Sequence, residues 1–401
     1  MMPHGFFDAV EPDSPVFSML EQLVPAVRAE TELPEGVNPT IHTELRADCL
    51  PSGEVEFRRF YWSAQHADSL SPLGFGGRMV YRDAKKAATP QTFVFPSEPA
   101  LPWLDDDDGP LRSDGPSAHI EVLRYIPLRR LTFRLHNGAG LPPQVIAKVK
   151  RTGGLNRAAA AFQAVQEAAE RSPSDTITVP RLLRLDARRH VAYLEHLPGE
   201  PLNVALGRFD LTSAMEQLGE LHRELQELDV RGLPKRLGTA DWLQDAQHAA
   251  VQIGLFVPSA ARQAESVYAE LARSAPEDGR MLYCQGDFLP GQVLCDPNGW
   301  SVIDLDDSRY ADPLSEVAAM YAAMPRELAL PPAQTEVARR TYLEAYARRA
   351  GEPIDPRRWQ WFRVLLEFRE LGKRVIKGRA TAEEVASVLE RLTNRGTSGL
   401  G

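Results

Sequence analysis

Residues 285–318 read QGDFLPGQVLCDPNGWSVIDLDDSRYADPLSEVA, and this stretch decides the fold of the chain. It begins with a polar loop whose course is fixed by two glycines and a proline. The runs QVLC and WSVID then flank DPNG, a turn sequence typical of β-hairpins. Because a short hairpin brings its two ends together, Gln292 at its start and Asp304 at its end are expected to lie close to each other.

Oxygen-bearing side chains in this stretch predict a chemical site. Asp287 in the polar loop is the candidate base for an attacking hydroxyl, although standing alone it would be interpreted as a turn or capping residue. The Gln292 amide oxygen and the Asp304 carboxylate can share one Mg²⁺, because hard cations prefer oxygen ligands. Asp306 shares the face of Asp304 if the chain stays extended, and is a candidate second ligand or substrate contact. A base and a metal site in this order indicate phosphoryl transfer.

The order of elements along the chain predicts an α+β fold with two lobes. Residues 119–198 contain strand-like runs and one helical segment, whereas residues 199–401 are mostly amphipathic helices interrupted by the hairpin. Residues 96–118 are rich in Pro, Asp, Gly and Ser, which is typical of a linker. Residues 1–95 are therefore expected to form a separate N-terminal α/β cap domain.

The stretch 285–318 resembles the catalytic segment of the aminoglycoside phosphotransferase and choline kinase-like family. In that family a His-Gly-Asp loop with a downstream asparagine precedes an Ile-Asp pair and then a Gly-Asp-Pro segment. The resemblance implies a bilobal protein-kinase-like fold, with a small β-rich N-lobe and a larger helical C-lobe. It also implies ATP and Mg²⁺ as cofactors, with Asp287 as the catalytic aspartate and with Gln292 and Asp304 as the metal ligands.

The strand-like run QVIAKVK supplies a candidate phosphate-binding lysine. Alternation puts Lys148 on the face opposite its apolar neighbours; Lys150 lies on the same face and is the alternative. The family resemblance favours Lys148. Since such a lysine usually pairs with a glutamate on the next helix, we expect a pair with Glu167, or with Glu170 as a near-equal choice.

Other positions follow from the resemblance or receive no role. The segment YLEHLPGEPL resembles the connection between the lobes, where the backbone of Glu195 and Leu197 would bind adenine. Asp312 matches the Asp-Pro segment, and we expect it to cap the following helix. His196 and His222 are assigned no role, because a lone histidine on a strand or helix more often packs or lies at the surface.

The chain departs from the family pattern in three places. RYIPLRR stands where a glycine-rich loop is expected, so Arg124, Arg129 and Arg130 are candidates to hold phosphates by charge. With the N-terminal extension, this loop resembles the maltokinase-like branch, which also carries a cap. Gln285 replaces the histidine, and its amide can make the same supporting hydrogen bonds. Gln292 replaces the asparagine and presents the same amide oxygen on a stem one methylene longer.

The composition excludes several other classes of function. The formal net charge of −9 disfavours binding to nucleic acid, which requires a basic face. No stretch has the roughly 20 apolar residues of a membrane helix, and no signal peptide is recognisable at the N-terminus. The three cysteines fit reduced thiols, so a cytoplasmic location is expected.

We therefore expect an ATP-dependent phosphotransferase that transfers the γ-phosphate to a hydroxyl of a small molecule, such as a sugar, an aminoglycoside or an amino-alcohol. The alternative is a catalytically inactive pseudokinase that binds nucleotide or acts as a scaffold. The two glutamine substitutions motivate this alternative.

Overall fold

The computed structural model describes most of both lobes and parts of the N-terminal region. The described residues are 11, 38–40, 47–49, 55–57, 63–65, 75–78, 91–94, 101, 119–126, 130–137, 142, 144–150, 152–172, 177–376 and 379–398. The expected linker, residues 96–118, therefore lies outside the description except for Leu101.

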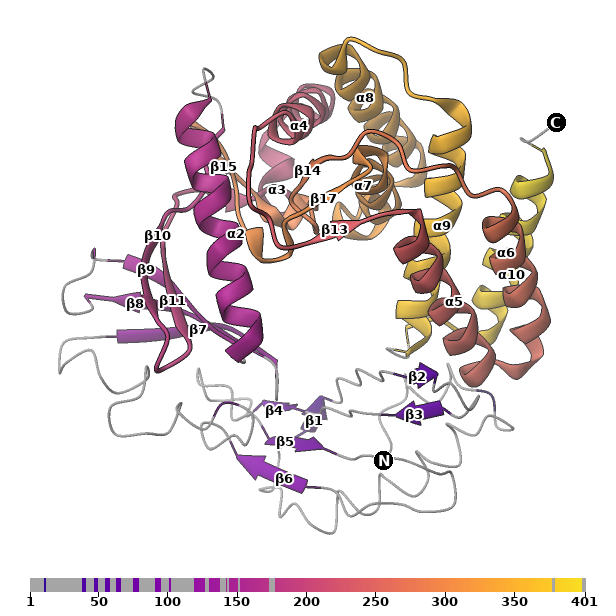
Figure 1. Cartoon of the computed structure of the whole chain (residues 1–401), viewed down its shortest axis with the longest axis horizontal. Helices are drawn as coiled ribbons and strands as arrows, with labels where there is room; N and C mark the ends of the chain where they lie inside the picture. The colour runs from indigo at the N-terminus through magenta and orange to yellow at the C-terminus, as the bar shows by residue number, and fades with distance from the viewer. Residues whose placement is uncertain are drawn as a thin grey trace.

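The smaller lobe is a five-stranded antiparallel sheet with one long helix beside it (Figure 1). Its elements are β7 (His119–Ile126), β8 (Arg130–His136), β9 (Gln144–Lys150), α2 (Thr152–Arg171), β10 (Leu182–Asp186) and β11 (Val191–Glu195). The strand order is β10-β11-β9-β8-β7. Burial alternates along β8 and β9, because successive side chains point to opposite faces of the sheet.

The two faces of this sheet contact different parts of the chain. One face forms a hydrophobic cluster that includes Phe133, Ala147 and Val149, and Leu101 from the N-terminal region is fully buried in it. The other face carries Ile146 towards the cluster that α2 shares with the helical lobe. Lys148 is on this second face, as the alternation predicts, and therefore faces the helical lobe.

The larger lobe consists of helices that form two hydrophobic clusters. Its main helices are α3 (Leu202–Ala205), α4 (Leu211–Gln226), α5 (Thr239–Phe256), α6 (Ala261–Arg273), α7 (Pro313–Glu327), α8 (Pro332–Ala350), α9 (Pro356–Ile376) and α10 (Ala382–Ser398). One cluster joins α5, α6, α9 and α10, and the other joins α2, α4, α7 and α8. Within the described ranges, no helix is both long enough and apolar enough to cross a membrane.

Residues 285–318 form short strands and 3-10 turns before α7 begins. They are η5 (Pro290–Gln292), β15 (Val293–Asp296), β16 (Gly299–Val302), η6 (Leu305–Asp307) and β17 (Arg309–Ala311). The strands join two small sheets with β12 (Glu200–Pro201), β13 (Arg236–Leu237) and β14 (Leu282–Cys284). Strands β15 and β16 form the predicted hairpin, with Val293 opposite Val302. Asp312 then caps α7 by accepting a hydrogen bond from the Leu314 N–H at 3.0 Å, as expected.

The described parts of the N-terminal region contact both lobes. They include β1 (Asn38–Thr40), β2 (Ala47–Cys49), β3 (Val55–Phe57), β4 (Ser63–Gln65), β5 (Phe75–Arg78) and β6 (Gln91–Val94), which lie below the two lobes in Figure 1. Glu11 donates its N–H to the Phe256 carbonyl at 3.0 Å and accepts the Ser259 N–H at 3.0 Å, at the turn between α5 and α6. Leu101 is buried in the small lobe, so the region is anchored to each lobe separately.

Candidate active site

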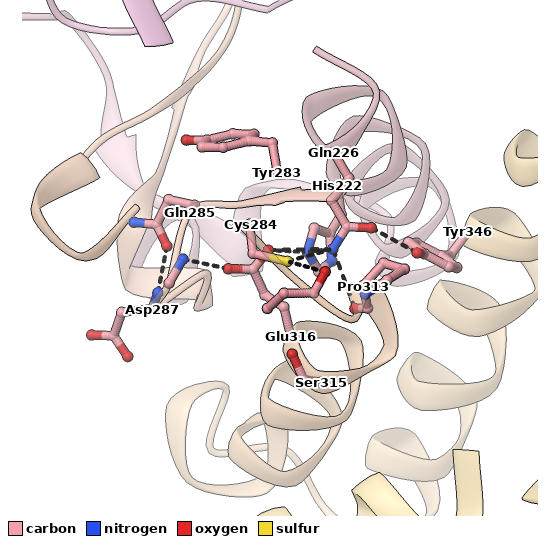
Figure 2. A network of polar contacts seen from close by, with 12 residues as sticks. His222, Gln226, Tyr283, Cys284, Gln285, Asp287, Pro313, Ser315, Glu316 and Tyr346 are labelled. Carbon is pink, nitrogen blue, oxygen red and sulfur yellow. Dashed lines mark hydrogen bonds and ion pairs between the residues drawn. The ribbon is translucent and has the colours of Figure 1, made fainter. Parts of the chain in front are cut away.

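Asp287 lies in the loop between β14 and η5, at the edge of the helical lobe. Its side chain reaches solvent and points away from the buried polar network beneath the loop (Figure 2). Protein crowds the carboxylate on its other sides, and this desolvation raises the pKa of Asp287 above its ordinary value. The nearby Lys373 ammonium opposes the rise in pKa, whereas Asp304 adds to it. A carboxylate in this position can accept a proton from a bound hydroxyl.

Gln285 fixes this loop from inside the protein. Its side chain is fully buried, and its Nε2 donates to the carbonyl oxygens of Ile303 at 2.9 Å and Asp304 at 2.7 Å. Its Oε1 accepts the backbone N–H of Asp287 at 2.7 Å. The glutamine therefore ties the backbone at the two candidate site carboxylates to each other, which is the supporting role expected of it.

Gly286 is required by the backbone of the loop. Its φ is +101°, a conformation that side chains disfavour, and a Cβ added there would lie 2.2 Å from the carbonyl oxygen of Asp307. The Gly286 N–H donates to Glu316 Oε1 at 2.6 Å, and its carbonyl accepts from Arg309 Nη2 at 2.7 Å. Both polar groups of this residue are thus held immediately before Asp287.

A buried polar network supports the loop from α4, α7 and α8 (Figure 2). Glu316 Oε2 lies 3.0 Å from His222 Nε2 and 3.3 Å from Gln226 Nε2, while Tyr346 donates to Gln226 Oε1 at 2.7 Å. The His222 ring stacks on Phe288 with centroids 4.0 Å apart. Burial alone would raise the pKa of Glu316, but His222 and the N–H donor from the loop hold it below its ordinary value.

This network assigns His222 a role that sequence reasoning missed. His222 and Glu316 are 94 positions apart in the sequence, and neither belongs to a recognisable local motif. Only the fold brings the α4 histidine under the α7 glutamate. The available signal was the helical spacing of His222 and Gln226, which puts both polar side chains on one face of α4.

Lys148 contacts the end of the hairpin across the space between the lobes. Its Nζ lies 2.5 Å from Asp304 Oδ1 and 3.3 Å from Asp306 Oδ1, and Lys150 pairs with the other oxygen of Asp306. Burial alone would raise the pKa of Asp304, but the charge and hydrogen bond of Lys148, with the charges of Arg130 and Lys150, together hold that pKa far below the ordinary range. The pKa of Lys148 is raised, because the two carboxylates outweigh its desolvation. Lys148, not Lys150, therefore reaches Asp304.

The two expected metal ligands stand at adjacent ends of the hairpin. The Gln292 carbonyl accepts the Ile303 N–H at 2.9 Å, which puts the Gln292 residue beside Asp304. The donor chemistry fits Mg²⁺, since an amide oxygen and a carboxylate are hard ligands. No group of three or more His, Cys, Asp or Glu side chains suited to a metal occurs in the part of the chain that the structure describes. Water and phosphate oxygens would therefore supply the remaining ligands.

The expected ion pair between Lys148 and Glu167 is not formed. Glu167 points to solvent with 68% of its side chain exposed, and its ion pair is with Arg171 at 3.8 Å. The alternative, Glu170, accepts a hydrogen bond from Gln166 at 2.9 Å. The prediction considered how far along the helix Glu167 lies but not which face of the helix it occupies. The face of α2 that turns inward is apolar, so Glu167 is on the face exposed to solvent.

Glu195 and Leu197, the residues expected at the adenine site, lie in the connection between the lobes. Leu197, which follows β11, is largely buried, and among the described residues none accepts a hydrogen bond from its N–H. The Glu195 side chain pairs with Arg181 through two hydrogen bonds of 3.0 Å, which lower the pKa of Glu195. The Glu195 side chain is therefore held to one side of its backbone.

The loop that replaces a glycine-rich turn is described in part. Arg130 is close enough to Asp304 to lower the pKa of that carboxyl, so it belongs to the site. Arg124 is exposed on β7. Arg129 lies outside the described residues.

A small antiparallel sheet with an inward lysine, a helical lobe with a loop aspartate, and a hairpin carboxylate between them define a kinase-like phosphotransferase. A model of the phosphotransferase enzyme family matches residues 128–362, which is more than half of the chain. The chain therefore belongs to the phosphotransferase enzyme family, and its two lobes form the protein-kinase-like fold.

Similar proteins agree with this family. An aminoglycoside 3'-phosphotransferase of Streptomyces fradiae is 26% identical over 274 residues, covering 65% of this chain and 99% of the relative. The same enzyme of Streptomyces ribosidificus is 27% identical over 204 residues, covering 48% of this chain and 74% of the relative. The crystal structure of aminoglycoside phosphotransferase APH(4)-Ia covers 71% of this chain and 95% of its own, with a TM-score of 0.50 and 16% identity, so it shares the fold. The expected maltokinase-like branch stays a prediction.

Proposed function

We propose that this protein transfers the γ-phosphate of ATP to a hydroxyl of a small molecule in a Mg²⁺-dependent reaction. The observation that carries the proposal is the contact of Lys148 with Asp304 at 2.5 Å. Asp304 is in turn joined through Gln285 to the loop of Asp287. A phosphate-binding cation, a metal ligand and a base are thus in one connected site.

Each group has a role that its surroundings support. Asp287 orients the acceptor hydroxyl and takes its proton, since its raised pKa makes it a stronger base than an ordinary aspartate. Lys148 contacts the nucleotide phosphates, and Leu197 N–H and Glu195 C=O bind the adenine edge. Gln292 and Asp304 hold Mg²⁺, which when bound would neutralise charge on the phosphate oxygens. A protein that uses ATP in this way would act in the cytoplasm, where ATP is available.

Among the candidate acceptors, the charges around Asp287 favour a neutral sugar. Asp306, which otherwise suits a cationic substrate, is neutralised by two lysines. Lys373 and Arg309 lower the pKa of Asp287 and offset the carboxylates of Asp304 and Asp307, which raise it, so the surroundings of Asp287 carry no excess of negative charge for a polycation. The relatives are named aminoglycoside 3'-phosphotransferases, which makes aminoglycosides the second class to test.

The alternative is a pseudokinase, motivated by the two glutamine substitutions. Gln285 retains hydrogen bonds on both sides of the loop, and Asp287, Asp304 and Lys148 are all present. These observations favour an active enzyme.

The proposal is tested by incubating the full chain with MgATP and a panel of sugars, aminoglycosides and amino-alcohols, and measuring phosphorylated product by mass spectrometry. We expect product with a neutral sugar. Nucleotide binding without product from any acceptor would support the pseudokinase instead.

A further inference from the structure

Asp306 is a buried carboxylate held between two lysines. Only 4% of its side chain is exposed. One oxygen lies 3.3 Å from Lys148 Nζ, and the other pairs with Lys150 Nζ. The two lysine side chains are themselves 13% and 16% exposed. Since an unpaired buried charge is strongly unfavourable, Lys150 depends on this carboxylate, and Lys148 is held by it together with Asp304.

Helix α2 offers these lysines no counter-charge. Its inward face carries Leu155, Ala158, Phe162 and Val165, all buried, and the Lys148 ammonium lies 5.4 Å from the Phe162 ring centroid. The helix packs on η6, the turn that contains Asp306. The carboxylate next to the lysines therefore comes from the hairpin end and not from the helix.

Asp304 cannot serve as the permanent partner of Lys148 if it is a metal ligand. A carboxylate that binds Mg²⁺ shares its charge with the ion, so its attraction for a lysine weakens. Asp306 remains beside Lys148 and also pairs with Lys150. Without Lys150, only Lys148 and Arg130 would balance the carboxylates of Asp304 and Asp306, which leaves less positive charge for an incoming polyphosphate.

From these contacts we infer that Asp306 is a positioning residue which holds Lys148 and Lys150 towards the nucleotide phosphates, and that Lys150 is a second phosphate-binding cation. Asp306 takes the place of a helix glutamate as the lysine partner. The inference rests on the proposed function, because it assigns residues within that nucleotide site.

The direction in which Asp306→Asn changes the affinity for ADP distinguishes a positioning role from a purely electrostatic effect. If Asp306 were a bystander, Asp306→Asn would remove a negative charge near the phosphates and tighten ADP binding. If Asp306 positions the lysines, the same change weakens binding, because both ammonium groups lose their common anchor. Lys150→Met is the second variant; it leaves Asp306 with Lys148 as a partner, so a folding failure of Asp306→Asn does not end the test.

Titration calorimetry of the full chain with ADP, with and without Mg²⁺, measures these effects, and thermal unfolding checks that each variant folds. We expect Asp306→Asn and Lys150→Met each to raise the Kd for MgADP about tenfold or more. Lys150→Arg should recover most of the affinity. In turnover assays the KM for ATP should rise while the KM for the acceptor stays unchanged. Glu167→Gln, which neutralises an exposed carboxylate of α2, is the matched control and should bind like the wild type.

Unchanged or tighter MgADP binding by folded Asp306→Asn, or unchanged binding by Lys150→Met, would overturn the inference while leaving the proposed function intact. Weakened binding by Glu167→Gln to the same extent would also overturn it, because the lysine partner would then be on the helix. If the wild type binds neither ADP nor ATP, the proposed function fails, and the inference fails with it.

Discussion

Gln285 Nε2 donates to the carbonyl oxygen of Asp304 at 2.7 Å, while the Oε1 of the same side chain accepts the Asp287 N–H at 2.7 Å. One amide therefore connects the loop of the candidate base to the candidate metal ligand. A carboxamide can do this because it has both a donor and an acceptor. Gln285, which replaces the histidine of the family motif, therefore still connects these two parts of the site.

Gln285→Ala should remove these hydrogen bonds and leave buried backbone groups unpaired. We expect the free energy of unfolding to fall by about 2–4 kcal/mol, and kcat to fall further than the stability loss explains, because Asp287 and Asp304 are no longer held together. Chemical denaturation and turnover assays measure the two effects. Gln166→Ala, which removes hydrogen bonds to Glu170 and to the Leu182 N–H in the small lobe, is the control and should leave kcat unchanged. A Gln285→Ala protein with wild-type kcat would contradict the positioning role.

The loss of activity on the acidic side of the pH–rate profile, its acidic limb, should reflect protonation of Asp287. A base works when it is deprotonated, and desolvation raises the pKa of Asp287. Activity should therefore be lost, as the pH falls, at a higher pH than an ordinary aspartate would give. Lys373 lowers this pKa, so Lys373→Met should move the limb to still higher pH. Lys373→Arg preserves the charge and should leave it in place. An unmoved limb in Lys373→Met would show that another group controls it.

Glu316→Gln should destabilise the protein by about 1.5–3 kcal/mol at neutral pH, because it removes a buried carboxylate that accepts the Gly286 N–H and contacts His222 and Gln226. The folded-state pKa of Glu316 is lowered, so its contribution is complete above the unfolded pKa and is lost as the pH falls through the folded one. The wild type should thus lose stability in acid faster than the variant does. Glu336→Gln, in an exposed pair with Arg339, should cost less than about 1 kcal/mol. Parallel acid denaturation curves for wild type and Glu316→Gln would contradict this.

Gly286→Ala should be more damaging than other glycine substitutions. The new Cβ combines a φ of +101° with a 2.2 Å approach to backbone, so we expect a loss of about 3 kcal/mol or more in the free energy of unfolding. Gly232→Ala has a φ of +78° and open space, which isolates the backbone effect at about 1 kcal/mol. Gly207→Ala has neither problem and should be neutral. Equal stabilities for Gly286→Ala and Gly232→Ala would show that the loop can shift.

The hairpin and the facing of Lys148 could be predicted because both depend on local patterns. DPNG between two apolar runs specifies a turn, and alternation along β9 specifies which side of the sheet a lysine occupies. The cap at Asp312 is local for the same reason. These features require no knowledge of distant residues.

The partners across the fold could not be predicted in the same way. The contact of Lys148 with Asp306 spans 158 positions, and that of His222 with Glu316 spans 94. The failed pairing with Glu167 shows the difficulty: the distance was suitable, but the inward face of α2 is apolar, so the counter-charge comes from η6. The partner of a buried charged residue depends on how distant elements pack against each other, and the hydrophobic periodicity of the sequence does not specify that packing.

The most direct test of an active phosphotransferase compares the wild type with Asp287→Asn. The full chain, MgATP and a neutral sugar acceptor are combined, and both ADP release and phosphorylated sugar are measured. We expect acceptor-dependent product from the wild type and a loss of about 10²–10⁴-fold in kcat for Asp287→Asn, with MgADP affinity unchanged. Equal product formation by the two proteins, or no product from the wild type with any acceptor of the panel, would contradict the proposal that this protein is an active phosphotransferase with Asp287 as its base.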